Sequence, residues 1–368
     1  MRTDGSPCES GCGLKLEPIS QHREEKMRMT LRNYLLPAVA AMAMTLAAPA
    51  TAQDKDKDVT IGVAGSSSQI ALLALNVART KGFIPDEGVN LEVIDFGSGS
   101  KGVQAFVAGE VDFVAATFEH SIRLNSKGIP ARSVVSLSKA PGIVMGVTKS
   151  FEPDFKEMKD LVGKAVGVSA PGSASHTFLK LILSKSGVNP EDVGAVGVGN
   201  AAGAVAAVRT GSEIQATVGY DPVMTMLETS GDIKVIVDLR DTEETKKMLG
   251  TDFTFLSLIA NKEYVDSNPE AVQAVVNGVV KALKWIPTVS PEEVLAAVPE
   301  EFWKENKDLY LESIKKNLSG LSTDGQVTQS EAEGVYEALL TEDDQVDPSK
   351  VNFADTFDNS FAEKANAN

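Results

Sequence analysis

The stretch Ala170-Pro171-Gly172-Ser173-Ala174-Ser175-His176 lies between an apolar, strand-like run at residues 164–169 and an amphipathic, helix-like run at residues 177–186. A Gly/Ser turn at such a junction leaves several backbone N–H groups at a helix N-terminus without partners inside the helix. Together with the serine hydroxyls and the positive end of the helix dipole, these donors suit a small anion or another acceptor-rich group. A single turn of this kind is also an ordinary helix cap, so its meaning depends on whether the chain repeats it.

The same succession of strand, polar turn and helix recurs along the chain. In the first part, apolar strand-like runs are followed by Gly65–Ser68, Gly97–Ser100 and Thr117–His120. In the second part, such runs are followed by Ala170–His176, Gly199–Ala202 and Tyr220–Pro222. This rhythm is typical of α/β domains with a largely parallel sheet, where ligands bind outside the carboxyl ends of the strands. The sequence therefore predicts two α/β units with polar turns at one edge of each.

Two segments of the chain also resemble each other. Residues 106–117 and residues 208–220 share a glycine, a following hydrophobic residue and an apolar strand-like run, with one inserted residue. Thr117 and Tyr220 are then expected at equivalent strand ends in two similar lobes. A site between the lobes would collect both residues together with the Gly/Ser turns.

The composition limits the classes of function. The chain has 368 residues, of which 43% are hydrophobic, and a formal net charge of −16, which is typical of a soluble globular protein long enough for two domains. The negative charge argues against nucleic acid and anionic membrane surfaces as partners. An anionic ligand would have to be held by local donors against this overall field. We expect a monomer that binds a small molecule.

The N-terminal region has the organisation of a secretory signal peptide. We interpret residues 1–26 as an over-extended start and residues 27–52 as the signal peptide, in which a basic segment precedes an apolar run and the small-x-small site Ala50-Thr51-Ala52. Cleavage after Ala52 and export to the periplasm are expected. Because Cys8 and Cys12 are the two cysteines of the chain, the mature protein is predicted to have no disulfide, thiolate metal site or cysteine nucleophile.

Three segments together carry a family resemblance. Residues 71–116 read ALLALNVARTKGFIPDEGVNLEVIDFGSGSKGVQAFVAGEVDFVAA, residues 160–193 read DLVGKAVGVSAPGSASHTFLKLILSKSGVNPEDV, and residues 220–222 read YDP. In this order they resemble the nitrate/alkanesulfonate/taurine-type substrate-binding proteins of ABC importers, which belong to a superfamily similar to thiamine-pyrimidine-binding proteins. The resemblance covers about residues 59–290.

The resemblance implies a type II periplasmic binding protein fold, with two α/β lobes, two hinge crossovers and a cleft that closes on the ligand. It places lobe 1 at residues 53–145 and 245–345, lobe 2 at residues 146–244, and an irregular acidic tail at residues 346–368. It also implies a transporter permease with its ATPase as partners. The ligand-binding residues that it selects are Ser66, Ser67, Ser68, Gln69, Ser98, Gly99, Ser100, Thr117, Phe118, Glu119, Gly172, Ser173, Ala174, Ser175, Tyr220 and Asp221.

Three alternatives remain for the function. The anion hypothesis favours the Ser/Gly turns and usually one basic residue, for which Lys101, Lys139 and Arg209 are candidates or exposed helix charges. The carboxylates of Glu119 and Asp221, with nearby aromatic residues, would instead suit a pyrimidine or another nitrogen heterocycle. An enzyme is disfavoured, since the histidines and carboxylates show no nucleophile-elbow or metal-ligand spacing, and the cysteine-rich motif of related pyrimidine-synthesis enzymes is absent. No cofactor or metal is predicted.

Overall fold

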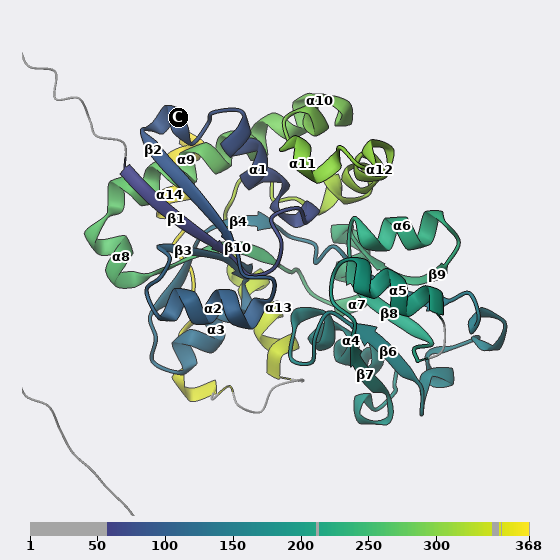
Figure 1. Cartoon of the computed structure of the whole chain (residues 1–368). Coiled ribbons are helices and arrows are strands. Elements are labelled where there is room, and N and C mark those ends of the chain that lie inside the picture. Colours follow the sequence, from purple (N-terminus) through teal and green to yellow (C-terminus); the bar gives the residue numbers. More distant parts are fainter. Residues whose placement is uncertain (1–56, 211–212, 341–345, 347, 368) are drawn as a thin grey trace, which may run out of the picture. The chain divides into compact units, whose positions relative to one another are not determined.

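The computed structural model describes residues 57–210, 213–340, 346 and 348–367. Within these residues, ten strands form two five-stranded sheets with the orders β2-β1-β3-β10-β4 and β7-β6-β8-β5-β9 (Figure 1). We call the first sheet with its helices the first lobe and the second sheet with its helices the second lobe. The two orders correspond strand by strand, with β2, β1, β3, β10 and β4 matching β7, β6, β8, β5 and β9. The expectation of two similar α/β lobes is therefore confirmed.

The first sheet is parallel except for one strand. β1 pairs in parallel with β2 and β3, whereas β10 runs antiparallel between β3 and β4. Its strands span Lys57–Val63 (β1), Val89–Asp95 (β2), Phe113–Thr117 (β3), Ala131–Ser138 (β4) and Leu256–Asn261 (β10). β3 and β10 are almost entirely buried, which fits their central positions, since a strand covered on both faces is apolar throughout.

The second sheet repeats this design. β6 pairs in parallel with β7 and β8, and β5 runs antiparallel between β8 and β9. Its strands span Ile143–Thr148 (β5), Ala165–Val168 (β6), Gly194–Gly197 (β7), Ala216–Tyr220 (β8) and Ile233–Leu239 (β9). β3 and β8 hold the same place in the two sheets and end at Thr117 and Tyr220, so the predicted equivalence of these two strand ends is confirmed.

Helices cover the faces of both sheets (Figure 1). In the second lobe they are α4 (Ala174–Lys185), α5 (Ala202–Thr210), α6 (Val223–Thr229) and α7 (Thr242–Leu249). In the first lobe they are α1 (Leu73–Thr80), α2 (Gly99–Val107), α3 (Glu119–Ser126), α8 (Lys262–Ser267), α9 (Pro269–Trp285), α10 (Pro291–Ala296), α11 (Glu300–Trp303), α12 (Lys307–Asn317), α13 (Gln329–Leu340) and α14 (Ser360–Ala367). Long α9 packs against α1, α14 and β4 and buries ten of its residues.

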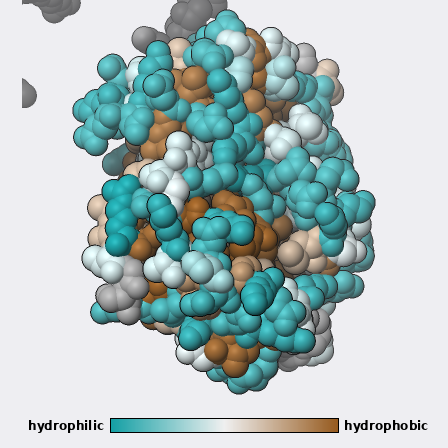
Figure 2. Space-filling view, turned by 90° about the vertical axis from the view of Figure 1, so that its right-hand side faces the viewer, coloured by the Kyte–Doolittle hydropathy of each residue, from teal (hydrophilic) through white to brown (hydrophobic). Residues whose placement is uncertain are grey.

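The surface keeps few large apolar side chains exposed. Among the described residues, Val107 and Val162 are the exposed large hydrophobic residues. On the face turned toward the viewer in Figure 2, hydrophilic residues surround smaller hydrophobic patches. None of the described helices is long and apolar enough to cross a membrane.

The structure differs from the sequence expectation at three places. β5 pairs with β8 and β9 along its whole length, so residues 143–145 belong to the second sheet although the sequence assigned them to lobe 1. α7 packs on β9 and α4, which carries the second lobe on to Leu249, beyond residue 244. The acidic tail was expected to be irregular, but residues 360–367 form α14, whose Phe361 is buried. Residues 1–52, with the expected start and signal peptide, lie outside the described range.

Candidate ligand-binding site

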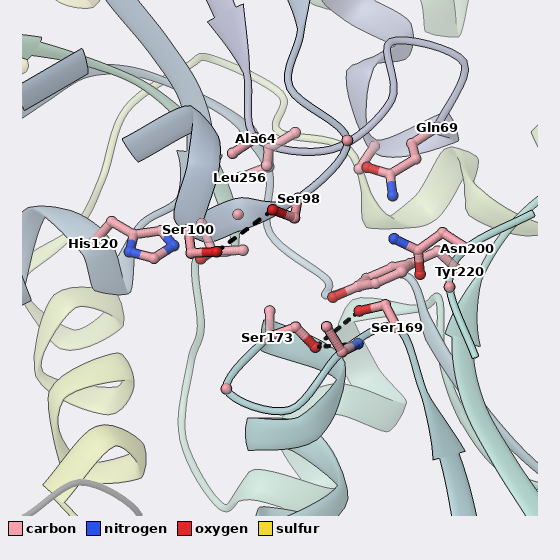
Figure 3. Close-up of a pocket in the computed structure, with 18 of the residues that line it drawn as sticks. Ala64, Gln69, Ser98, Ser100, His120, Ser169, Ser173, Asn200, Tyr220 and Leu256 are labelled. Carbon is pink, nitrogen blue, oxygen red and sulfur yellow. Dashed lines mark hydrogen bonds between the residues drawn. The ribbon is translucent and has the colours of Figure 1, made fainter. Parts of the chain in front are cut away.

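A pocket of about 330 Å³ opens between the strand ends of the two lobes (Figure 3). Its volume lies at the lower end of the range of small-molecule sites, about 300–1,000 Å³. Nine of the residues selected from the sequence line it: Gln69, Ser98, Gly99, Ser100, Thr117, Gly172, Ser173, Ala174 and Tyr220. Seven others do not: Ser66, Ser67, Ser68, Phe118, Glu119, Ser175 and Asp221. The pocket has eleven further lining residues: Ala64, Ala71, Gly97, His120, Ser169, Ala170, Pro171, Gly199, Asn200, Phe255 and Leu256.

The turn before α2 presents unused backbone donors to the pocket. Ser98 has an extended backbone and makes no side-chain cap bond, and within the described part of the chain the N–H groups of Gly99 and Ser100 have no acceptor. Gly102 lets the helix approach the end of β1, because a Cβ there would lie 2.8 Å from the Cα of Ala64. The first turn of α2 is thereby held at the pocket wall with its positive end directed at the site.

The turn before α4, Ala170–His176, is braced from within. The hydroxyls of Ser169, Ser173 and Ser175 lie 2.8–3.0 Å from one another. Ser173 also accepts a hydrogen bond from the backbone of His176, and Nδ1 of His176 accepts one from the Gly172 N–H at 2.9 Å. Ser175 is fully buried and supports the turn, while Ser169 and Ser173 face the pocket (Figure 3).

The polar groups of the Ser66–Ser68 turn bond to other parts of the protein and hold the turn in place. The N–H and hydroxyl of Ser67 both donate to the carboxylate of Asp95, at 3.0–3.1 Å. The carbonyl of Ser67 accepts from Asn76, and that of Ser68 accepts from the hydroxyl of Tyr310 at 2.9 Å. Because these groups are already engaged, the turn contributes to the pocket through the residue after it, Gln69.

The two predicted carboxylates are engaged elsewhere. Asp221 is 3% exposed and accepts hydrogen bonds from the Thr225 N–H and from Asn317, both at 2.7 Å, and from Arg240 at 3.3 Å. Glu119 lies 4.0 Å from Arg123 in the same helix. Neither lines the pocket, although the negative charge of Glu119 acts on the lining residues Tyr220 and His120.

The pocket lining carries no formally charged side chain among the described residues. Of the three basic candidates, Lys101 is exposed, Lys139 lies 2.7 Å from Glu331, and Arg209 lies 2.8 Å from Asp232. The titratable lining groups are His120 and Tyr220.

Burial favours the neutral form of both titratable groups. Burial lowers the pKa of His120, and burial together with the negative charge of Glu119 raises the pKa of Tyr220 well above its usual range. The hydroxyl of Tyr220 points into the pocket (Figure 3) and is therefore a neutral donor.

Two buried polar atoms of the lining have no hydrogen-bond partner within the described residues: Thr117 Oγ1 and Asn200 Oδ1. Buried polar atoms are normally paired, so both are available to a ligand or to water. The lining also includes an aromatic pair, Phe255 and Tyr220, whose rings are tilted relative to each other with 6.3 Å between their centroids. The site thus combines neutral donors with an aromatic pair.

The described residues contain no group of three or more His, Cys, Asp or Glu side chains placed to hold a metal ion. The lining also offers no general base next to a nucleophile in hydrogen-bond contact.

These features define two α/β lobes of the periplasmic binding protein fold with a pocket between their strand ends. The sequence matches the model of the NMT1/THI5-like family over residues 69–293, more than half of the chain. The chain belongs to the NMT1/THI5-like family. A solved structure from Bordetella bronchiseptica RB50 is 39% identical, with a TM-score of 0.79 and coverage of 85% of this chain and 98% of that chain.

More distant matches include one solved structure and two sequence relatives. The alkanesulfonate-binding protein SsuA from Xanthomonas axonopodis pv. citri is 17% identical, with a TM-score of 0.63, and the match covers 82% of this chain and 98% of that one. YtlA of Bacillus subtilis, which is named as a binding protein, is 22% identical over 70% of this chain and 75% of its own. The yeast 4-amino-5-hydroxymethyl-2-methylpyrimidine phosphate synthase THI5 is 24% identical over 63% of this chain and 65% of its own.

Proposed function

We propose that this protein is the soluble periplasmic ligand-binding component of an ABC-type importer and that it binds a small anion of the sulfonate, taurine or nitrate type. The observation that carries the proposal is the convergence of three turns before helices, those of α2, α4 and α5, on one pocket lined from both lobes. Helix N-termini with free N–H groups stabilise negative charge without a charged side chain. The sixteen residues selected from the sequence remain candidates, with the nine lining residues as the first to test.

Ligand capture would close the lobes about the two chain crossovers, at residues 139–142 and 250–255. A ligand that contacts Ser98 and Ser100 in one lobe and Ser173 in the other stabilises the arrangement in which both contacts are made. The transporter permease and its ATPase would then recognise the ligand-bound arrangement.

A nitrogen heterocycle such as a pyrimidine is the second candidate. The tilted pair of Tyr220 and Phe255 offers an aromatic surface, and Asn200 Oδ1 offers a buried acceptor for a ring amino group. The yeast relative is named for a pyrimidine product, but the pyrimidine-synthesis enzymes carry a cysteine-rich motif, and this chain has no cysteine after Cys12. A non-enzymatic binding protein is therefore favoured in either case.

A ligand screen by thermal unfolding and isothermal titration calorimetry separates these functions. Ethanesulfonate, taurine, nitrate and 4-amino-5-hydroxymethyl-2-methylpyrimidine are tested on the purified protein; a ligand at 100 times its Kd adds about 2.7 kcal/mol of stability. We expect stabilisation by one or more anions and none by the pyrimidine. Stabilisation by the pyrimidine alone would replace the anion assignment, and consumption of a stabilising ligand would overturn the binding-protein assignment. N-terminal sequencing of the exported protein tests cleavage after Ala52.

A further inference from the structure

The anion site has no permanent cation in its lining, but it has one side chain that can become a cation. His120 lines the pocket, and within the described residues neither of its ring nitrogens has a hydrogen-bond partner. Its Nε2 lies 3.6 Å from the position that a Cβ on Gly99 would occupy. Figure 3 shows the imidazole beside Ser100, at the first turn of α2. An anion oxygen bound to the free N–H groups of Gly99 and Ser100 would therefore lie within reach of His120.

We propose that His120 supplies the positive charge that the pocket otherwise lacks, by taking up a proton from solvent when the anion binds; this rests on the proposed anion-binding function. Because the proton comes from solvent and not from another group of the protein, the net charge of the complex is one unit more positive than the sum of the free protein and the anion. The resulting imidazolium donates a charge-assisted hydrogen bond to the anion, which is about twice as strong as a neutral one.

The ligand-free protein keeps this imidazole neutral for two reasons. Burial lowers the pKa of His120, and the positive ends of two helices oppose a second positive charge: His120 is in the first turn of α3 and faces the first turn of α2. A bound anion reverses the effect of the helix ends, because it lies between them and the imidazole. Protonation of His120 and anion binding are then linked, and each favours the other.

None of the surrounding charged groups can replace His120 as the group in the pocket that takes up the proton. On α3 and at its C-cap, Glu119 favours the protonated imidazole while Arg123 and the C-cap residue Lys127 oppose it. The charged or titratable groups on the elements that adjoin α3 or the pocket are Lys101 on α2, Arg132 on β4, His176, Lys180 and Lys185 on α4, Arg209 on α5, Tyr220 on β8, Glu331, Glu333, Tyr336 and Glu337 on α13, and Lys350 before the chain end. Of these, Tyr220 alone lines the pocket, and it is neutral. We therefore expect the coupling between proton uptake and anion binding to depend on His120.

The test is calorimetry of ethanesulfonate binding, with nitrate in parallel, because both probes stay ionised across the pH range used. Titrations in two buffers of different ionisation enthalpy, at about pH 6 and about pH 8.5, measure protons taken up per anion. We expect net uptake of up to one proton at the lower pH and an affinity there that is roughly tenfold higher for each unit by which the pKa of His120 in the complex lies above that pH. In His120→Gln the uptake and the pH dependence should disappear. In Lys127→Gln, which loses an exposed charge from the same helix, both should persist.

A second measurement does not depend on a variant. The mature chain has two histidines, His120 and His176, so two imidazole C–H signals can be followed by NMR with and without ethanesulfonate. We expect the titration midpoint of His120 to rise on binding and that of His176 to change little. Anion binding without proton uptake, or with an unshifted His120 midpoint, overturns this inference and leaves the proposed function intact. If neither anion binds at any pH, the proposed function itself fails.

Discussion

Replacing Asp221 by asparagine should cost stability and spare ligand affinity. The side chain of Asp221 is 1% exposed and accepts hydrogen bonds from the Thr225 N–H, Asn317 and Arg240. The amide in Asp221→Asn keeps one acceptor oxygen and turns a donor toward Asn317 or Arg240, so at least one buried charge-assisted bond is lost. Such a loss costs about 1.5–3 kcal/mol.

The neighbours of Arg240 set the upper limit of this cost. Removing the sole partner of a buried charge costs about 3–5 kcal/mol, but Arg240 also pairs with Asp238 and with Glu228. We therefore expect about 2 kcal/mol for Asp221→Asn, within the hydrogen-bond range. The matched control is Glu228→Gln, which removes another carboxylate partner of the same arginine; its side chain is 30% exposed, so its cost should stay within about 1 kcal/mol.

Urea unfolding followed by circular dichroism measures the free energy of unfolding, and calorimetry measures the affinity for the best ligand of the screen. We expect Asp221→Asn to change the Kd by less than about fivefold, which corresponds to roughly 1 kcal/mol. A variant with wild-type stability and a Kd raised by about a hundredfold or more would show that Asp221 contacts the ligand, and the reasoning from its burial would be refuted.

Three further outcomes are expected. Gly102→Ala should lower stability by about 1 kcal/mol by urea unfolding, because overpacking against Ala64 (about 1–3 kcal/mol) exceeds the gain in helix propensity (about 1 kcal/mol); a net stabilisation would contradict this. Ser173→Ala removes the cap of α4 and should cost about 1 kcal/mol while weakening anion binding in calorimetry; unchanged affinity would remove Ser173 from the site. Because burial lowers the pKa of His176, protonation favours the unfolded chain, so stability should fall as pH drops below about 6.5. Urea midpoints in His176→Gln should be less sensitive to acid, and an undiminished sensitivity would assign the effect to another group.

The sequence reveals the pocket turns because their signal is local. A strand-like run followed by Gly or Ser and a helix marks a strand end, and parallel strand ends meet at one edge of a sheet. Thr117 and Tyr220 could be paired from the internal similarity alone, and both line the pocket. Asp221 follows the same strand end but does not line the pocket, because strand-end position does not fix side-chain direction. Successive side chains leave a strand on opposite faces, so Tyr220 faces the pocket while Asp221 faces Arg240.

Phe255 and Leu256 were missed for a different reason. They stand at the N-terminal end of β10, which runs antiparallel to its neighbours, so its beginning lies at the edge where the parallel strands end. The prediction considered only the residues that follow the carboxyl ends of strands, so it did not include the residues at the beginning of β10. α14 was missed because a single helix of eight residues, Ser360–Ala367, is stabilised by contact with α9 rather than by a strong pattern of its own.

The absence of lysine and arginine from the described pocket lining bears on how such a protein could both capture and release an anion. A permanent cation would hold an anion equally well at every pH and would attract any other anion when the ligand is absent. Helix N-termini supply partial charges that act only within about one turn, so they contribute little to the long-range field of a chain whose net charge is −16. Selectivity then depends on contact geometry at the turns of Ser98–Ser100 and Ala170–Ser173. In the proposed site, an imidazole that is charged only in the complex would add its electrostatic contact to these fixed dipoles after the anion is bound, and this contact would be lost when the proton leaves.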